Sequence, residues 1–74
     1  MENFIMKVNK YVAECGHPVL ASTVAADLKL SLYNVALATV FMIGDQVDVK
    51  TVGGREIHVG DFFRFDFTIH QINP

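Results

Sequence analysis

The chain has 74 residues, which suffices for one domain with one modest hydrophobic core. Hydrophobic residues make up 51% of it, so we expect some apolar surface to stay exposed until a partner covers it. Eight acidic and six basic residues give a net charge of −2, which provides no general attraction to nucleic acid or to anionic membranes. With a single cysteine, Cys15, the chain cannot form an internal disulfide.

Three further features predict a cytoplasmic protein. A lone cysteine suits a reducing compartment. The first residues lack the basic region and the apolar block of a secretory signal. The longest apolar run, residues 35 to 43, is too short to cross a bilayer, so we expect no contact with a membrane.

Residues 2 to 15 predict a first helix, because their apolar residues recur at helical spacing on one face. Gly16 and Pro18 predict its end, since glycine accepts the left-handed conformation found there and proline cannot continue a helix.

Residues 21 to 43 predict two helices joined by a tight turn. Apolar residues share one face of the first of these helices: Val24, Ala25 and Leu28. Residues 29 to 31 interrupt it, and Ser31 predicts the cap of the next helix, because its hydroxyl can accept a backbone N–H. On that helix, about residues 32 to 43, three side chains share a face that we expect to point to the core: Val35, Thr39 and Met42.

Residues 46 to 59 predict a β-hairpin. Val47 and Val49 alternate with polar residues, and so do Ile57 and Val59 on the returning side. Between them, residues 53 and 54 are both glycine, which tolerates the positive φ of a tight turn.

Residues 62 to 70 predict a C-terminal strand with one apolar side, made of Phe63, Phe65, Phe67 and Ile69. An uncovered apolar edge strand favours aggregation. We therefore expect this strand either to join the hairpin's sheet or to pair across a dimer.

A helix-turn-helix followed by a glycine-tipped hairpin resembles the winged helix-turn-helix superfamily. The resemblance covers about residues 3 to 60 and rests on the fold, without a subfamily motif. It implies an α+β fold in a single domain over residues 1 to 74, with three helices, the hairpin as the wing, and the C-terminal strand. It also implies a small regulator of bacterial or phage type. In that superfamily a Ser or Thr commonly caps the second helix where Leu20 stands; here that cap is missing or displaced to Ser22.

In DNA-binding relatives, the outward face of the third helix carries basic and polar residues that read bases and phosphates. Here only Ser31, Tyr33 and Asn34, near the start of the predicted helix, can make such hydrogen bonds. It contains no Lys or Arg, and its expected outward positions are Leu32, Tyr33, Ala36, Leu37 and Val40. We therefore predict a module that acts through protein–protein contacts, by dimerising with itself or by docking on a partner protein. The predicted interface anchors are Leu32, Tyr33, Leu37, Val40 and Phe41. In the competing interpretation these side chains pack inside the monomer against the C-terminal strand.

A DNA-binding transcriptional regulator is the alternative, implied by what winged-helix relatives do. Its candidate DNA contacts lie at the start of the third helix, in the turn before it and on the wing: Lys29, Ser31, Tyr33, Asn34, Lys50 and Arg55. So few basic residues give a monomer low affinity for DNA.

The remaining polar residues predict neither a catalytic site nor a metal site, and we expect no enzyme activity, no cofactor and no small-molecule substrate. Among possible metal ligands only Cys15 and His17 lie close in sequence, whereas zinc sites show paired ligands on two sides. No serine or threonine has a nearby histidine and acid, so nucleophilic catalysis has no support. Four acidic residues beside turns or on strands predict a solvated surface: Asp45, Asp48, Asp61 and Asp66.

Overall fold

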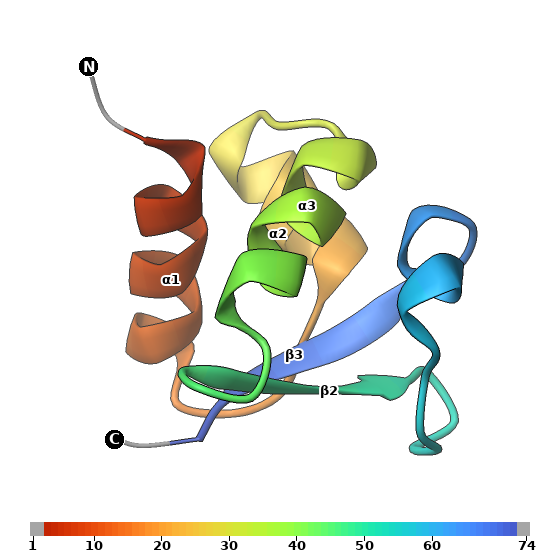
Figure 1. Cartoon of the computed structure of the whole chain (residues 1–74). Helices are drawn as coiled ribbons and strands as arrows, with labels where there is room; N and C mark the ends of the chain where they lie inside the picture. Colours follow the sequence, from red (N-terminus) through yellow and green to blue (C-terminus); the bar gives the residue numbers. More distant parts are fainter. Residues whose placement is uncertain (1–2, 73–74) are drawn as a thin grey trace.

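The computed structural model describes residues 3 to 72 and shows an α+β fold (Figure 1). The ends of the predicted domain, including position 2 of the predicted first helix, lie outside these residues. In chain order the elements are α1 (Phe4–Cys15), β1 (Val19–Leu20), α2 (Ala21–Leu28), α3 (Leu32–Met42), β2 (Val47–Thr51), the 3-10 helix η1 (Val59–Phe63) and β3 (Phe67–Gln71). The predicted class, three helices followed by an antiparallel sheet, is confirmed.

The sheet has the order β1-β3-β2, with all pairings antiparallel, and the helices cover one face of it (Figure 1). The C-terminal strand β3 is therefore the central strand, where Ile69 lies opposite Val19 on one side and Val49 on the other. We expected this strand either to join the hairpin's sheet or to pair across a dimer. The structure shows the first arrangement, because β3 pairs with strands of its own chain.

The hairpin differs from the prediction in its returning strand. Strand β2 pairs with β3, with Val47 opposite Gln71 and Thr51 opposite Phe67, and residues 57 to 59 form no strand. The predicted turn is present, because Gly54 has a φ of 86° and its N–H donates to the carbonyl of Thr51 at 2.9 Å. It opens a long loop, residues 52 to 66, rather than a short hairpin.

The predicted alternation of phenylalanines along the last strand is wrong before residue 67. Phe67 and Ile69 are fully buried, but Phe63 and Phe65 are exposed and Phe62 is buried in their place. The reason is that residues 59 to 63 form a 3-10 helix, whose period is near three rather than two. The Phe62 ring stacks on Phe67, with the ring centroids 5.0 Å apart.

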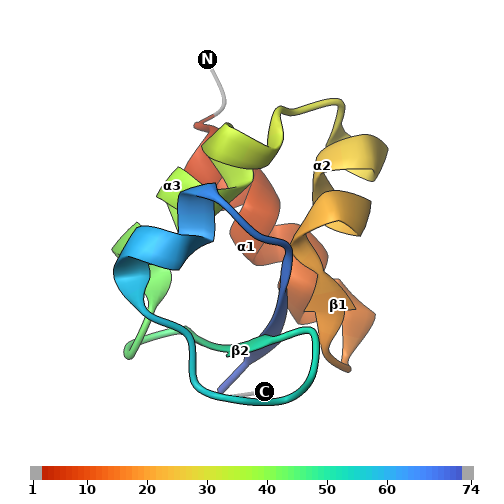
Figure 2. The same cartoon turned by 90° about the vertical axis from the view of Figure 1, so that its right-hand side faces the viewer.

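Helix α3 packs against three elements: α1, α2 and η1. Figure 2 shows η1 beside α3. Its predicted core residues are confirmed, since Val35 and Thr39 are fully buried and Met42 nearly so. Ala36, predicted to point outward, is also fully buried, because its small side chain lets a neighbouring element approach closely.

The turn between α2 and α3 follows the sequence prediction. Lys29 ends α2 in the left-handed conformation with φ 58°, and the Leu30 N–H donates to the Ala25 carbonyl at 2.9 Å. Ser31 caps α3, because its Oγ accepts the Asn34 N–H at 3.0 Å. The two helices are bent by 116°, within the usual range for a helix-turn-helix.

Within residues 3 to 72 no single helix has the length and apolarity needed to cross a membrane. Helices α2 and α3 meet that test only when taken together, as a pair with a sharp bend between them.

The start of α2 is capped from far along the chain. Of the two expectations for this helix, a missing cap and a cap displaced to Ser22, the first is the one observed, because Leu20 precedes the helix without a side-chain cap. Instead the carboxylate of Asp66 accepts the Ser22 N–H at 3.0 Å and the Ser22 hydroxyl at 2.6 Å. Asp66 is thus no solvated surface residue, because it joins the beginning of β3 to the N-terminus of α2.

The outer edge of β2 is occupied by local hydrogen bonds. The Val47 carbonyl accepts the Gly44 N–H at 3.0 Å, and the Val49 N–H donates to the Asp48 carboxylate at 2.9 Å. The Thr51 N–H donates to the Arg55 carbonyl at 2.8 Å. These bonds make the addition of a further strand at this edge unfavourable.

Replacing Asp66 with alanine should lower the free energy of unfolding by about 1–2 kcal/mol, since α2 loses both its cap and a negative charge at its N-terminus. Asp66→Asn retains an acceptor oxygen and should lose less. The matched control is Asp45→Ala in an exposed turn, which should stay within about 0.5 kcal/mol of the parent. Equal urea-denaturation curves for Asp66→Ala and the control would contradict the capping role.

Candidate functional site

The outward side of α3 carries Tyr33, Leu37 and Phe41, spaced by four residues and therefore aligned along the helix. Tyr33 is 60% exposed and Phe41 is 67% exposed, while Leu37 is half-buried. Large apolar side chains this exposed are uncommon in so small a protein when they line one helix. These three predicted anchors thus lie together at the surface.

The other two predicted anchors, Leu32 and Val40, are half-buried and pack against the hydrophobic core. They lie four residues to either side of the fully buried Ala36, so this line of the helix is turned toward its neighbours. On the helix surface, Leu32 and Val40 therefore lie beside the row formed by Tyr33, Leu37 and Phe41.

Phe63 on η1 extends the exposed line of α3. Its ring centroid lies 5.1 Å from that of Tyr33, with the two planes tilted by 40°. Such tilted pairs are favourable beyond the area they bury. We call Tyr33, Leu37, Phe41 and Phe63 the aromatic face. Sequence reasoning missed Phe63 because alternation assigned it to the buried side of a strand, and no local signal marks the 3-10 helix.

The aromatic face contains no charged residue, because α3 has none along its whole length. The nearest residues in sequence to Phe63 include Arg64, whose guanidinium lies 5.6 Å from the centroid of the Phe65 ring. That distance permits a cation–π contact. The aromatic face is thus apolar, and the cation nearest to it in sequence, Arg64, lies directly after Phe63.

The six candidate DNA contacts are spread over several elements. Ser31, Tyr33 and Asn34 lie together at the start of α3. There the Ser31 hydroxyl is engaged as the cap, and the Tyr33 ring lies against the Phe63 ring in a tilted pair. Lys50 is half-buried on β2, opposite Thr68, and Arg55 is exposed in the turn that follows. The sixth, Lys29, lies in a cleft with two other lysines.

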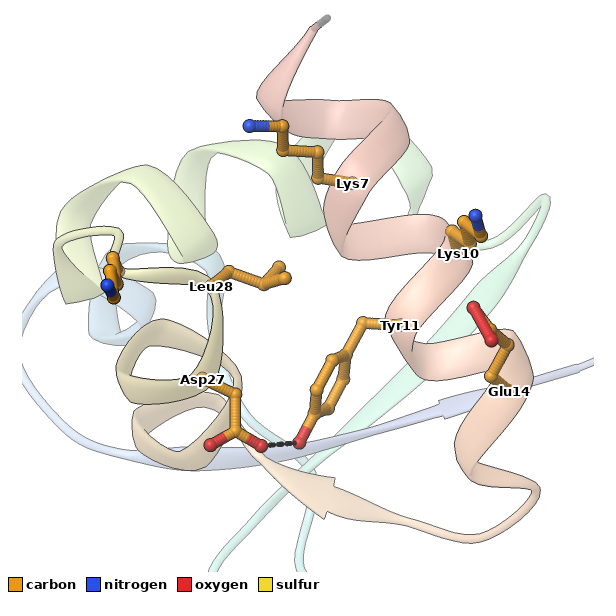
Figure 3. A pocket seen from close by; sticks show the side chains of 7 residues that line it. Lys7, Lys10, Tyr11, Glu14, Asp27 and Leu28 are labelled. Atoms are coloured by element: carbon orange, nitrogen blue, oxygen red, sulfur yellow. Dashed lines mark hydrogen bonds between the residues drawn. The ribbon is translucent and has the colours of Figure 1, made fainter.

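That cleft lies between α1 and the end of α2 and has a volume of about 390 Å³ (Figure 3). The Tyr11 hydroxyl donates a hydrogen bond to the Asp27 carboxylate across it. This hydrogen bond, together with desolvation and the charge of Asp27, raises the pKa of Tyr11 to about 12. The neutral phenol is therefore the form that the folded chain favours.

Two further clefts lie elsewhere on the surface. One of about 400 Å³ lies under the loop after β2 and is lined by Ile57 and Phe65 among others. The other, about 210 Å³, brings His17 and His70 to one opening. Within residues 3 to 72, no three His, Cys, Asp or Glu side chains are grouped so that they could hold a metal ion.

Neither a protein-family model, nor a curated protein, nor a solved structure matches this chain. Its three helices and its sheet of order β1-β3-β2 are compatible with a winged helix. Function is therefore argued from the surfaces described above.

The Tyr11–Asp27 hydrogen bond predicts a specific pH dependence. Because the folded pKa of Tyr11 is about 12 and the unfolded value is about 10, its stabilisation is complete below about pH 10. It is lost as the pH rises from about 10 to about 12, where a phenolate would face the carboxylate. The difference in free energy of unfolding between the parent and Tyr11→Phe should shrink over that range in urea titrations.

The matched control for this prediction is Val52→Ala, which changes an exposed side chain without a titratable group. Its difference from the parent in free energy of unfolding should be the same at both ends of the range. A constant difference for Tyr11→Phe as well would show that the hydrogen bond does not contribute.

Proposed function

We propose that this chain is a winged helix-turn-helix module that acts through protein–protein contacts at its aromatic face. The observation that supports this proposal most is an uncharged α3 that presents Tyr33, Leu37 and Phe41 to solvent, with the ring of Phe63 beside that of Tyr33. Exposed apolar patches mark interaction sites, and buried aromatic anchors are the usual source of interface energy.

The winged-helix assignment is supported by three features of the fold. Helices α2 and α3 cross at 116°, the sheet order places the C-terminal strand in the centre, and a long loop joins β2 to β3 in the position of a wing. A small regulator working in a reducing cytoplasm, with the free thiol of Cys15, fits this assignment.

A second copy of the chain is the partner we propose first. Strand β3 is paired on both sides, the outer edge of β2 is occupied, and the other edge strand, β1, has only two residues, so the sheet offers poor sites for self-association. Because α3 has no charged side chain, two copies of the aromatic face can meet without charge repulsion between their α3 helices. Burying Tyr33 and Phe41 of one copy at about 1.5–3 kcal/mol each supplies about 3–6 kcal/mol before association costs, which suits a reversible dimer.

DNA binding is the second candidate function. It is favoured by the winged-helix arrangement and by Asn34 at the start of α3, since asparagine can pair with adenine through two hydrogen bonds. The absence of Lys and Arg from α3 weighs against it, because phosphate contacts supply most of the affinity for DNA.

Replacing Phe41 with arginine should abolish self-association without unfolding the chain, because this side chain is 67% exposed. We expect sedimentation of the parent to depend on concentration and that of Phe41→Arg not to. The matched control is Val52→Arg, equally apolar and 63% exposed but outside the aromatic face.

Identical sedimentation of Phe41→Arg and the parent dimer would contradict the proposed interface. A parent that sediments as a monomer at every concentration would contradict self-association and leave a different protein as the partner. A large fall in melting temperature for Phe41→Arg would place this side chain in the monomer's core.

A further inference from the structure

Three of the six basic side chains of this chain surround one opening, the cleft between α1 and the end of α2 (Figure 3). Helix α1 contributes Lys7 and Lys10, and Lys29 closes the other side at the end of α2. The cleft also contains two carboxylates, those of Glu14 and Asp27. Positive charge therefore exceeds negative charge here, although the chain as a whole is acidic.

One of the two carboxylates, that of Asp27, has a hydrogen-bond partner within the cleft. Asp27 accepts the Tyr11 hydroxyl, which ties α2 to α1. Glu14 lies four residues after Lys10 on α1, so the two residues share one side of that helix. The ammonium groups of Lys7 and Lys29 make no hydrogen bond or ion pair to any residue from 3 to 72.

The floor of the cleft is apolar. Leu28 points from α2 toward α1 and lies between Lys7 and the ring of Tyr11 (Figure 3). A volume of about 390 Å³ accommodates a small organic molecule. The opening thus combines an apolar surface with two ammonium groups at its rim.

The backbone at Lys29 is unusual for a lysine. Among residues 3 to 72 it is the one non-glycine residue with a positive φ, at a helix end where glycine is normally favoured. Its left-handed conformation is costly for a side chain with a Cβ. A lysine in this position places an ammonium group at the rim of the cleft, where glycine would supply none.

We propose that this cleft binds a small organic anion, whose carboxylate or phosphate group is held by Lys7 and Lys29 while its apolar body lies on Leu28 and Tyr11. Charge-assisted hydrogen bonds from two ammonium groups would hold the anionic group. The proposal is independent of the aromatic face, which lies on α3 and η1.

Amide NMR titration of the full chain tests this proposal, with phenyl phosphate as the probe and benzoate and inorganic phosphate as comparisons. We expect saturable shifts at residues 7 to 14 and 27 to 29, with a Kd of about 1 mM. Phenyl phosphate binding more tightly than benzoate identifies a phosphate ligand, and the reverse order identifies a carboxylate ligand. Inorganic phosphate binding as tightly as phenyl phosphate would overturn the role of the apolar floor.

Two variants separate binding from folding. Lys29→Gly should weaken the binding of phenyl phosphate about tenfold while raising the melting temperature, because glycine adopts a positive φ without strain. Lys7→Gln should weaken binding to a similar extent. The matched control is Lys50→Gln on β2, which should leave binding unchanged. The proposal is overturned by shifts that never saturate, or by an equal loss of binding in Lys50→Gln.

Discussion

The burial of strand β3 in the middle of the sheet is the constraint on which the rest of the structure depends. Its Phe67 and Ile69 are fully buried and it pairs with β1 and β2 at once. The residue just before it, Asp66, caps α2, and Phe67 stacks on Phe62 of η1. Strand β3 thus positions strand β1, helix α2 and the loop after β2.

This arrangement leaves α3 as the element with the most prominent uncovered apolar surface. Its inner side is buried by α1, α2 and η1, where Ala36 and Ala38 allow close packing. Its outer side keeps Tyr33 and Phe41 in solvent. The outer edge of the sheet at β2 is closed by local hydrogen bonds. We therefore regard the proposed protein contact as a consequence of how α3 is packed.

The sequence predicts those parts of the fold that depend on local spacing. Helix α1, the turn between α2 and α3, and the Ser31 cap all follow from contacts within five residues, and the structure confirms them. The returning strand and the side chains of Phe63 and Phe65 were assigned wrongly. Their alternation mimics a strand, but the burial of Phe62 and Phe67 favours a 3-10 helix followed by a bend.

The features that sequence reasoning missed join residues that are distant along the chain. The Asp66 cap reaches Ser22 across 44 positions, and no pattern near either residue marks the other. The candidate site was partly predictable, since the lack of charge on α3 pointed to Tyr33, Leu37 and Phe41. Phe63 joined them only because η1 folds against α3.

The most direct test of the central claim, that α3 is a protein-binding and not a DNA-binding surface, is an amide NMR titration with a mixed-sequence DNA duplex at low salt. Low salt strengthens phosphate contacts and so gives DNA binding its best chance. The account predicts no shifts at residues 31 to 37 or 50 to 58 with the duplex in excess. Shifts confined to those residues, and reversed by added salt, would contradict it and make α3 and the wing a DNA-binding surface.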